Sequence, residues 1–71
     1  MEEYVIIIEK AGENYAAMVP DLPGCIGAAD TVEELEELMR EAVEFHIEGM
    51  RLHGEVVPPP STRVSKVRVT S

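Results

Sequence analysis

The sequence has 71 residues, 45% of them hydrophobic, and its 14 acidic against 6 basic side chains give a formal net charge of −8. This composition excludes a disordered chain, and no apolar run approaches the roughly 18 residues that a membrane-spanning helix needs. The negative charge disfavours direct nucleic-acid binding and favours a basic protein partner. The single cysteine, Cys25, excludes an intramolecular disulfide, and without a signal peptide it predicts a cytoplasmic protein. The length predicts one domain over residues 1–71. No Cys/His cluster offers a metal site, so no metal or other cofactor is expected.

The first half of the chain predicts three strands. Residues 4–9 (YVIIIE) are mostly β-branched or aromatic, which predicts a central strand covered on both faces. After a turn that contains glycine and asparagine, residues 15–19 (YAAMV) predict the second strand of an antiparallel hairpin. Two prolines make residues 20–24 a loop, and residues 25–29 (CIGAA) predict a short third strand.

One long helix is predicted over residues 32–53. Thr31 and Glu34 have the spacing of a capping box at its start, and Gly54 supplies its end. Apolar residues recur every three or four positions between them, which predicts one buried face.

The last predicted element is a strand over residues 62–70. It follows three prolines at residues 58–60, which form a stiff connector. The segment alternates, so Ser65, Val67 and Val69 share one face while Lys66 and Arg68 share the other. The basic exposed side indicates an edge strand.

Together these elements predict an α+β fold: a three- to four-stranded, mainly antiparallel sheet with one long helix on one face, in the order ββ(β)αβ. The single helix covers only one face, yet the first strand is apolar on both. Burying even about 400 Å² of the other face would contribute roughly 10 kcal/mol before association costs. We therefore predict a homodimer or higher oligomer, formed through the uncovered face or an edge strand.

Three short motifs stand out in the chain: residues 20–25 (PDLPGC), residues 27–31 (GAADT) leading into the helix, and residues 57–60 (VPPP). They resemble motifs of the HicB-like antitoxin family, which has a P-x-L-P-G-C turn, a G-D-T-x-E-E-A helix start and an I-P-x-P exit. Ala29 replaces the glycine before Asp30, and Leu35 stands where alanine is common. The match covers about residues 4–60.

The resemblance implies a partial RNase H-like fold without RNase H catalysis. It also implies a partner: a small basic toxin of the HicA type, a ribonuclease with a double-stranded-RNA-binding fold that cleaves mRNA. Antitoxins of this family block the active site of that toxin. Many members carry a further helix-turn-helix or ribbon-helix-helix module that represses their own operon. Residues 1–71 leave no room for such a module, so DNA binding is not expected of this chain.

An enzyme is the least supported function. Cys25 follows a tight turn, but no base or oxyanion hole is identifiable for it, so we predict a small buried hydrophobe. His46 and His53 lie about 10 Å apart along the helix, too far to share one metal ion.

RNase H chemistry needs carboxylates that hold two divalent ions. Glu9 ends the first strand instead of lying in its middle, and Asp21 and Asp30 are better explained as turn and cap residues. The sequence therefore predicts no catalytic site.

The acidic helix surface is the candidate binding site. Residues 31–53 contain seven glutamates and two arginines, with Glu36–Arg40 as the one clear i, i+4 pair. The simplest explanation is a solvated face that aids solubility, and the functional one is a docking surface for a basic toxin. The candidate partner-binding residues are Glu37, Glu41, Glu44 and Glu48. We predict a non-catalytic, antitoxin-like binding module; the alternative is a solitary homo-oligomeric structural or regulatory domain without a toxin partner.

Overall fold

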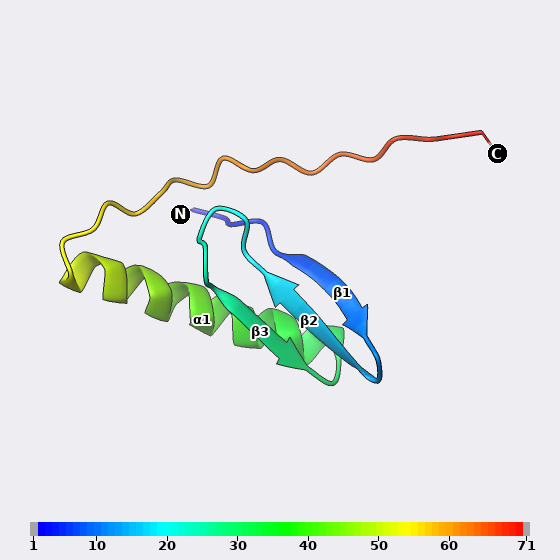
Figure 1. Cartoon of the computed structure of the whole chain (residues 1–71), viewed down its shortest axis with the longest axis horizontal. Coiled ribbons are helices and arrows are strands. Elements are labelled where there is room, and N and C mark those ends of the chain that lie inside the picture. Colours follow the sequence, from blue (N-terminus) through cyan, green and yellow to red (C-terminus); the bar gives the residue numbers. More distant parts are fainter. Residues whose placement is uncertain (1, 71) are drawn as a thin grey trace.

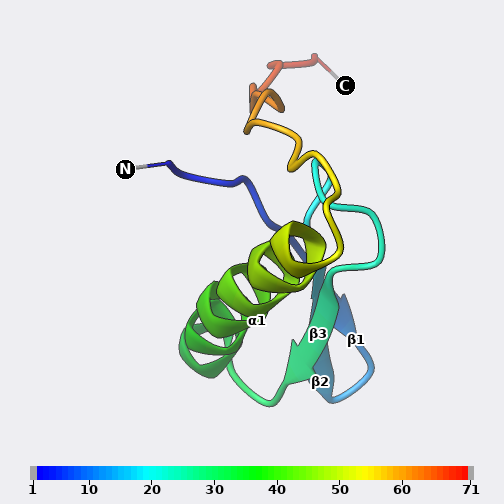
Figure 2. The same ribbon diagram turned by 90° about the vertical axis from the view of Figure 1, so that its left-hand side faces the viewer.

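The computed structural model describes residues 2–70 and contains a three-stranded sheet followed by one helix. The elements are β1 (Ile7–Ala11), β2 (Asn14–Met18), β3 (Ile26–Ala29) and α1 (Val32–Leu52). Both strand pairs are antiparallel and β2 lies in the middle. α1 lies against one face of the sheet (Figures 1 and 2). The predicted α+β fold is confirmed. Within residues 2–70, no helix is long and apolar enough to cross a membrane.

β1 is an edge strand, so the prediction of a central first strand is wrong. Tyr4 and Ile6 precede β1, and both pack with Ile8 against the core. Ile7 points to the opposite face and is 42% exposed. The apolar run therefore reflects alternate side chains that reach the core from an edge strand and its approach, not a strand between two neighbours.

The core lies between the sheet and the helix. β2, the loop after it and α1 supply the six residues that are buried within residues 2–70, which are Ala17, Val19, Leu22, Cys25, Leu35 and Met39. The loop is compact because the Val19 N–H donates to the Cys25 carbonyl and the Leu22 N–H to the Val19 carbonyl, both at 3.1 Å. This loop, although it contains prolines, buries the Leu22 side chain completely. The core is small, as expected for a chain of this length.

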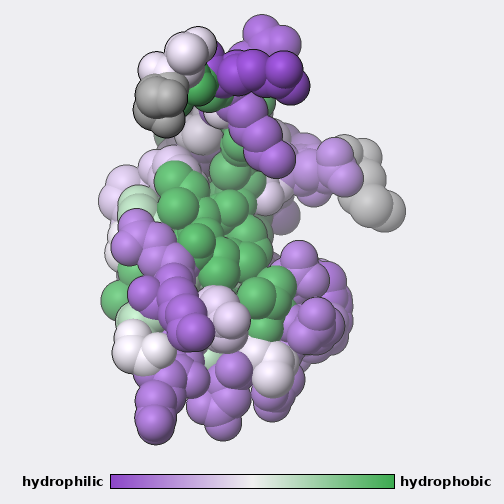
Figure 3. Space-filling model, turned by 90° about the vertical axis from the view of Figure 1, so that its right-hand side faces the viewer, coloured by the Kyte–Doolittle hydropathy of each residue, from purple (hydrophilic) through white to green (hydrophobic). Residues whose placement is uncertain are grey.

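The outer face of the sheet is uncovered in the single chain. Ile7, Met18 and Ile26 face one another across the three strands, and Ile26 is 72% exposed. Viewed from the side on which β1 lies, a continuous hydrophobic area runs between hydrophilic flanks (Figure 3). The sequence correctly indicates one covered and one uncovered face, and oligomerisation remains a prediction.

The predicted last strand does not form in the single chain. Residues 55–70 are extended but pair with no strand of the sheet among the described residues. The Asp21 carboxylate holds the chain at Ser61 and Thr62, and the residues beyond run away from the body (Figure 1). Alternating β-branched residues favour the extended conformation, but a strand also requires a neighbouring edge within reach.

Candidate partner-binding surface

The cap of α1 fixes where the acidic helix begins. Thr31 is the N-cap, and its hydroxyl oxygen accepts from the Glu34 N–H at 3.1 Å. The Glu34 carboxylate in turn accepts from the Thr31 hydroxyl at 2.9 Å, so the predicted capping box is present with this hydroxyl as the donor. Glu33 and Glu34 in the first turn also suit the positive end of the helix dipole. From this start, the apolar stripe faces the core and sets the opposite face toward solvent.

The four candidate glutamates form one stripe on that solvent face. At about 100° per residue, positions 37, 41, 44 and 48 fall within roughly 60° of arc. All four are exposed, and the side chains of Glu37 and Glu44 are 61% and 68% accessible. The structure therefore brings together the residues that the sequence selects, which are Glu37, Glu41, Glu44 and Glu48. We call them the acidic stripe.

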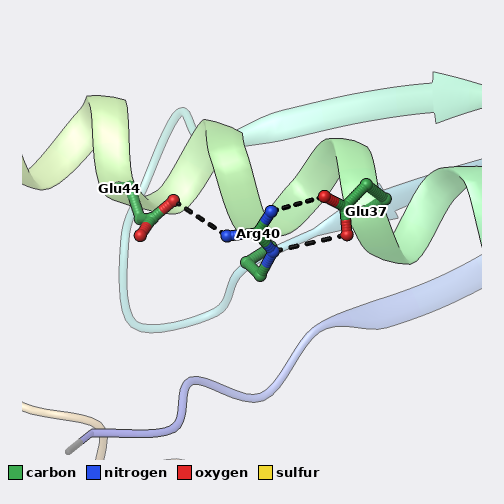
Figure 4. Close-up of polar contacts among 3 residues, drawn as sticks. All are labelled: Glu37, Arg40 and Glu44. Carbon is green, nitrogen blue, oxygen red and sulfur yellow. Dashed lines mark hydrogen bonds and ion pairs between the residues drawn. The ribbon is translucent and has the colours of Figure 1, made fainter.

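Arg40 divides the acidic stripe into paired and unpaired carboxylates. Its guanidinium forms an ion pair with Glu37 and another with Glu44, the latter at 3.3 Å (Figure 4). The predicted Glu36–Arg40 pair is wrong, because Arg40 pairs with Glu37 and Glu44 instead. Hydrogen bonding from Arg40 and its charge lower the pKa of Glu37. Within residues 2–70, Glu41 and Glu48 form no ion pair, so their charge is the most available to a partner.

An exposed apolar row runs beside the acidic stripe, and the sequence analysis missed it. Leu38, Phe45 and Leu52 are spaced seven residues apart, so they lie along one side of α1. Phe45 is 80% exposed and Leu52 is 78% exposed. The signal was the i, i+7 spacing of these large residues outside the buried stripe. An exposed aromatic residue beside charged groups is typical of a protein-binding surface.

Cys25 and His53 have structural roles. Cys25 is 4% exposed, and burial raises the pKa of its thiol, which confirms the predicted buried hydrophobe. The His53 ring nitrogen Nδ1 lies 2.8 Å from the Gly49 carbonyl at the end of α1. Among the described residues, no group of three or more His, Cys, Asp or Glu side chains could hold a metal ion.

The other carboxylates considered in the sequence analysis lie on separate segments of the chain. Glu9 is exposed on β1, and Asp30 stands one residue before the N-cap. Asp21 does more than the predicted turn role, because its carboxylate accepts four hydrogen bonds from Ser61 and Thr62, at 2.8 to 3.1 Å. The backbone N–H of Thr62 is the main cause that lowers the pKa of Asp21.

Comparison with known proteins gives a consistent result. The model of the HicB-like antitoxin of bacterial toxin–antitoxin systems matches residues 4–70. The chain is 40% identical over 47 residues to a UPF0150 protein of Archaeoglobus fulgidus, covering 65% of this chain and 68% of that protein. It is 35% identical over 57 residues to a UPF0150 protein of Thermoplasma acidophilum, covering 79% of this chain and 83% of that protein. A 14.9 kDa protein in the rep-hol intergenic region of Haemophilus phage HP1 is 47% identical over 55 residues, which cover 78% of this chain but only 41% of the phage protein.

Proposed function

The chain belongs to the HicB-like antitoxin family of bacterial toxin–antitoxin systems, and from this membership we propose that it is an antitoxin. In this proposal it is a non-catalytic module that acts in the cytoplasm and neutralises a small, basic, mRNA-cleaving toxin of the HicA type. The observation that carries the proposal is the acidic stripe of α1 beside the exposed Phe45. The two features offer a charged and an apolar contact on the same side of one helix.

Each feature contributes a different part of binding. The net charge of −8 attracts a basic protein, and Glu41 and Glu48 are free of ion pairs within residues 2–70. Burying a fully exposed Phe side chain contributes roughly 1.5–3 kcal/mol, so Phe45 supplies an anchor that charge alone does not. A toxin that normally binds RNA presents a basic surface, which the carboxylates of the stripe match.

The test is co-expression with a small basic toxin encoded beside the gene. The intact chain should restore growth and bind the toxin, whereas Glu41→Lys/Glu48→Lys and Phe45→Ala should each weaken binding at least tenfold, or about 1.4 kcal/mol. The matched control is Glu9→Lys/Glu13→Lys, which makes the same charge change at exposed positions away from α1. An equal loss of toxin affinity in both double variants would mean that the net charge of the chain attracts the toxin without a defined binding site. Full binding by all variants would exclude α1 as the docking surface.

A second function is favoured by the uncovered outer face of the sheet, where Ile7, Met18 and Ile26 are exposed. It is a solitary homo-oligomeric structural or regulatory domain without a toxin partner. Purification of the tagged chain from its native cells at low salt distinguishes the two. A stoichiometric small basic protein that salt releases supports the antitoxin. Recovery of this chain alone supports the self-associating domain.

A further inference from the structure

Residues 63–70, which we call the basic segment, have the character of a strand without a neighbour. They include three of the chain's six lysine and arginine residues and no acidic residue. The rest of the chain therefore carries −11, since the segment contributes +3 to a total of −8. Val67 and Val69 are 84% and 77% exposed and lie on one face of the extended chain. Such a row of exposed β-branched residues favours pairing with another strand.

The chain before the basic segment is fixed to the body. The Tyr4 hydroxyl donates to the Pro58 carbonyl at 2.6 Å, and the Asp21 carboxylate accepts from the backbone N–H groups of Ser61 and Thr62. These contacts hold the chain as far as residue 62. From there the basic segment projects past the sheet and does not return to it (Figure 1).

An open groove of about 640 Å³ lies between the N-terminal approach to β1 and α1. The approach passes above α1 in both ribbon views (Figures 1 and 2). Apolar side chains line the groove, and these are Tyr4, Ile6, Met39 and Val43. Its charged lining is mostly acidic and consists of Glu2, Glu3, Glu36, Glu44 and Arg40. The Arg40 guanidinium is already paired with Glu37 and Glu44, so the groove favours a basic, apolar occupant.

We propose that the basic segment of one copy binds in this groove of a second copy, as a fourth strand beside residues 4–8. Val67 and Val69 contact its apolar lining, and Lys66 and Arg68, which share the other face of the strand, meet its glutamates. Because each copy has one basic segment and one groove, the exchange is reciprocal and closes a two-fold homodimer. The strand that the sequence predicts at residues 62–70 is then formed between chains. The pairing also enlarges the small core of each chain.

The first test removes the apolar contact. Val67→Asp/Val69→Asp should reduce the mass measured by light scattering from twice 7.8 kDa to the single-chain value. The dissociation constant of the dimer should rise at least tenfold. Because both valines are exposed, the helical circular dichroism should not change. Val56→Asp is a control for adding an acidic side chain, since Val56 is 87% exposed outside the segment, and this variant should remain dimeric. A dimer that survives the double substitution overturns the proposal in favour of the outer sheet face. The proposal is also overturned if the intact chain is monomeric and its residues 63–70 resist hydrogen exchange, because the segment then pairs within its own chain.

The second test uses complementation. Glu2→Lys/Glu36→Lys changes the charge of the groove without touching the acidic stripe, so its outcome is independent of toxin binding. This variant and Val67→Asp/Val69→Asp should each be monomeric alone. Mixed in equal amounts they should form dimers, because one intact segment then meets one intact groove. Failure to associate on mixing would contradict reciprocal exchange.

Discussion

Gly27 determines how closely α1 approaches the sheet. A Cβ built at Gly27 would lie 2.9 Å from Met39 Sδ and 3.2 Å from Leu38 Cδ2. Met39 is only 1% exposed, so it has little room to move aside. We expect Gly27→Ala to lower the free energy of unfolding by about 1–3 kcal/mol, the usual cost of overpacking.

Gly49→Ala is the matched control for this prediction. A Cβ at Gly49 meets nothing within 4 Å, and alanine is favoured over glycine within a helix by about 0.8–1.0 kcal/mol. Urea denaturation of both variants should therefore give shifts of opposite sign. A Gly27→Ala variant as stable as the intact chain would show that α1 can shift away from β3.

The environment of a single residue is predictable from the sequence where the sequence offers that residue only one kind of neighbour. No base or oxyanion hole is identifiable for Cys25 in the sequence, and its side chain is buried in the structure. Phe45 shows the opposite case, because a large apolar residue in a helix is expected in the core, yet it is 80% exposed. The partner of Arg40 also escaped prediction, since three glutamates lie within reach and side-chain direction on the helix decides among them.

The link between the β2–β3 loop and residues 61–62 depends on the charge of Asp21. Hydrogen bonds from Thr62 and Ser61 hold the pKa of Asp21 below its ordinary value of 3.8. The hydrogen bonds from Ser61 and Thr62 to Asp21 therefore persist above pH 3.8 and are lost as the pH falls through the lowered pKa of Asp21. Amide chemical shifts of Ser61 and Thr62, followed by NMR as the pH is lowered, should show a transition with a midpoint below 3.8.

Asp21→Asn provides the control for this titration. Its side chain does not ionise, so the two amide signals should lack the transition. In the intact chain, a midpoint at or above 3.8 would mean that the carboxylate is not held by these donors in solution.

Elements with strong local signals were predictable, and those that depend on neighbours were not. The cap at Thr31 and the apolar period locate α1 to within one residue of the observed Val32–Leu52. The hairpin also follows from local turn chemistry, with Gly12 in a left-handed conformation at φ 67°. The edge position of β1 and the unpaired residues 62–70 depend on which strands are in reach, and that information is not local.

At the scale of the whole molecule, three surfaces of the chain remain open. The acidic stripe with its apolar row lies on the solvent face of α1. The groove lies between α1 and residues 2–6, and the outer sheet face lies on the side away from the helix. Within residues 2–70 only six residues are fully buried, so surface that a partner covers adds substantially to stability. In our proposals the first surface serves the toxin and the second serves another copy, and the two surfaces share Glu44.

The acidic stripe and Phe45 should affect different rate constants of toxin binding, the stripe the association rate and Phe45 the dissociation rate. Screening at 0.1 M salt limits exposed charges to about 10 Å, so the acidic stripe acts mainly while the partners approach. We expect Glu41→Lys/Glu48→Lys to slow association and to flatten its dependence on salt. Phe45→Ala should leave association nearly unchanged and speed dissociation, because the ring contributes only after desolvation. Surface plasmon resonance from about 50 to 500 mM NaCl measures both rates, a range over which the screening length shortens severalfold. If the glutamate variant altered only dissociation, the stripe would lie inside a desolvated contact and would not steer the approach.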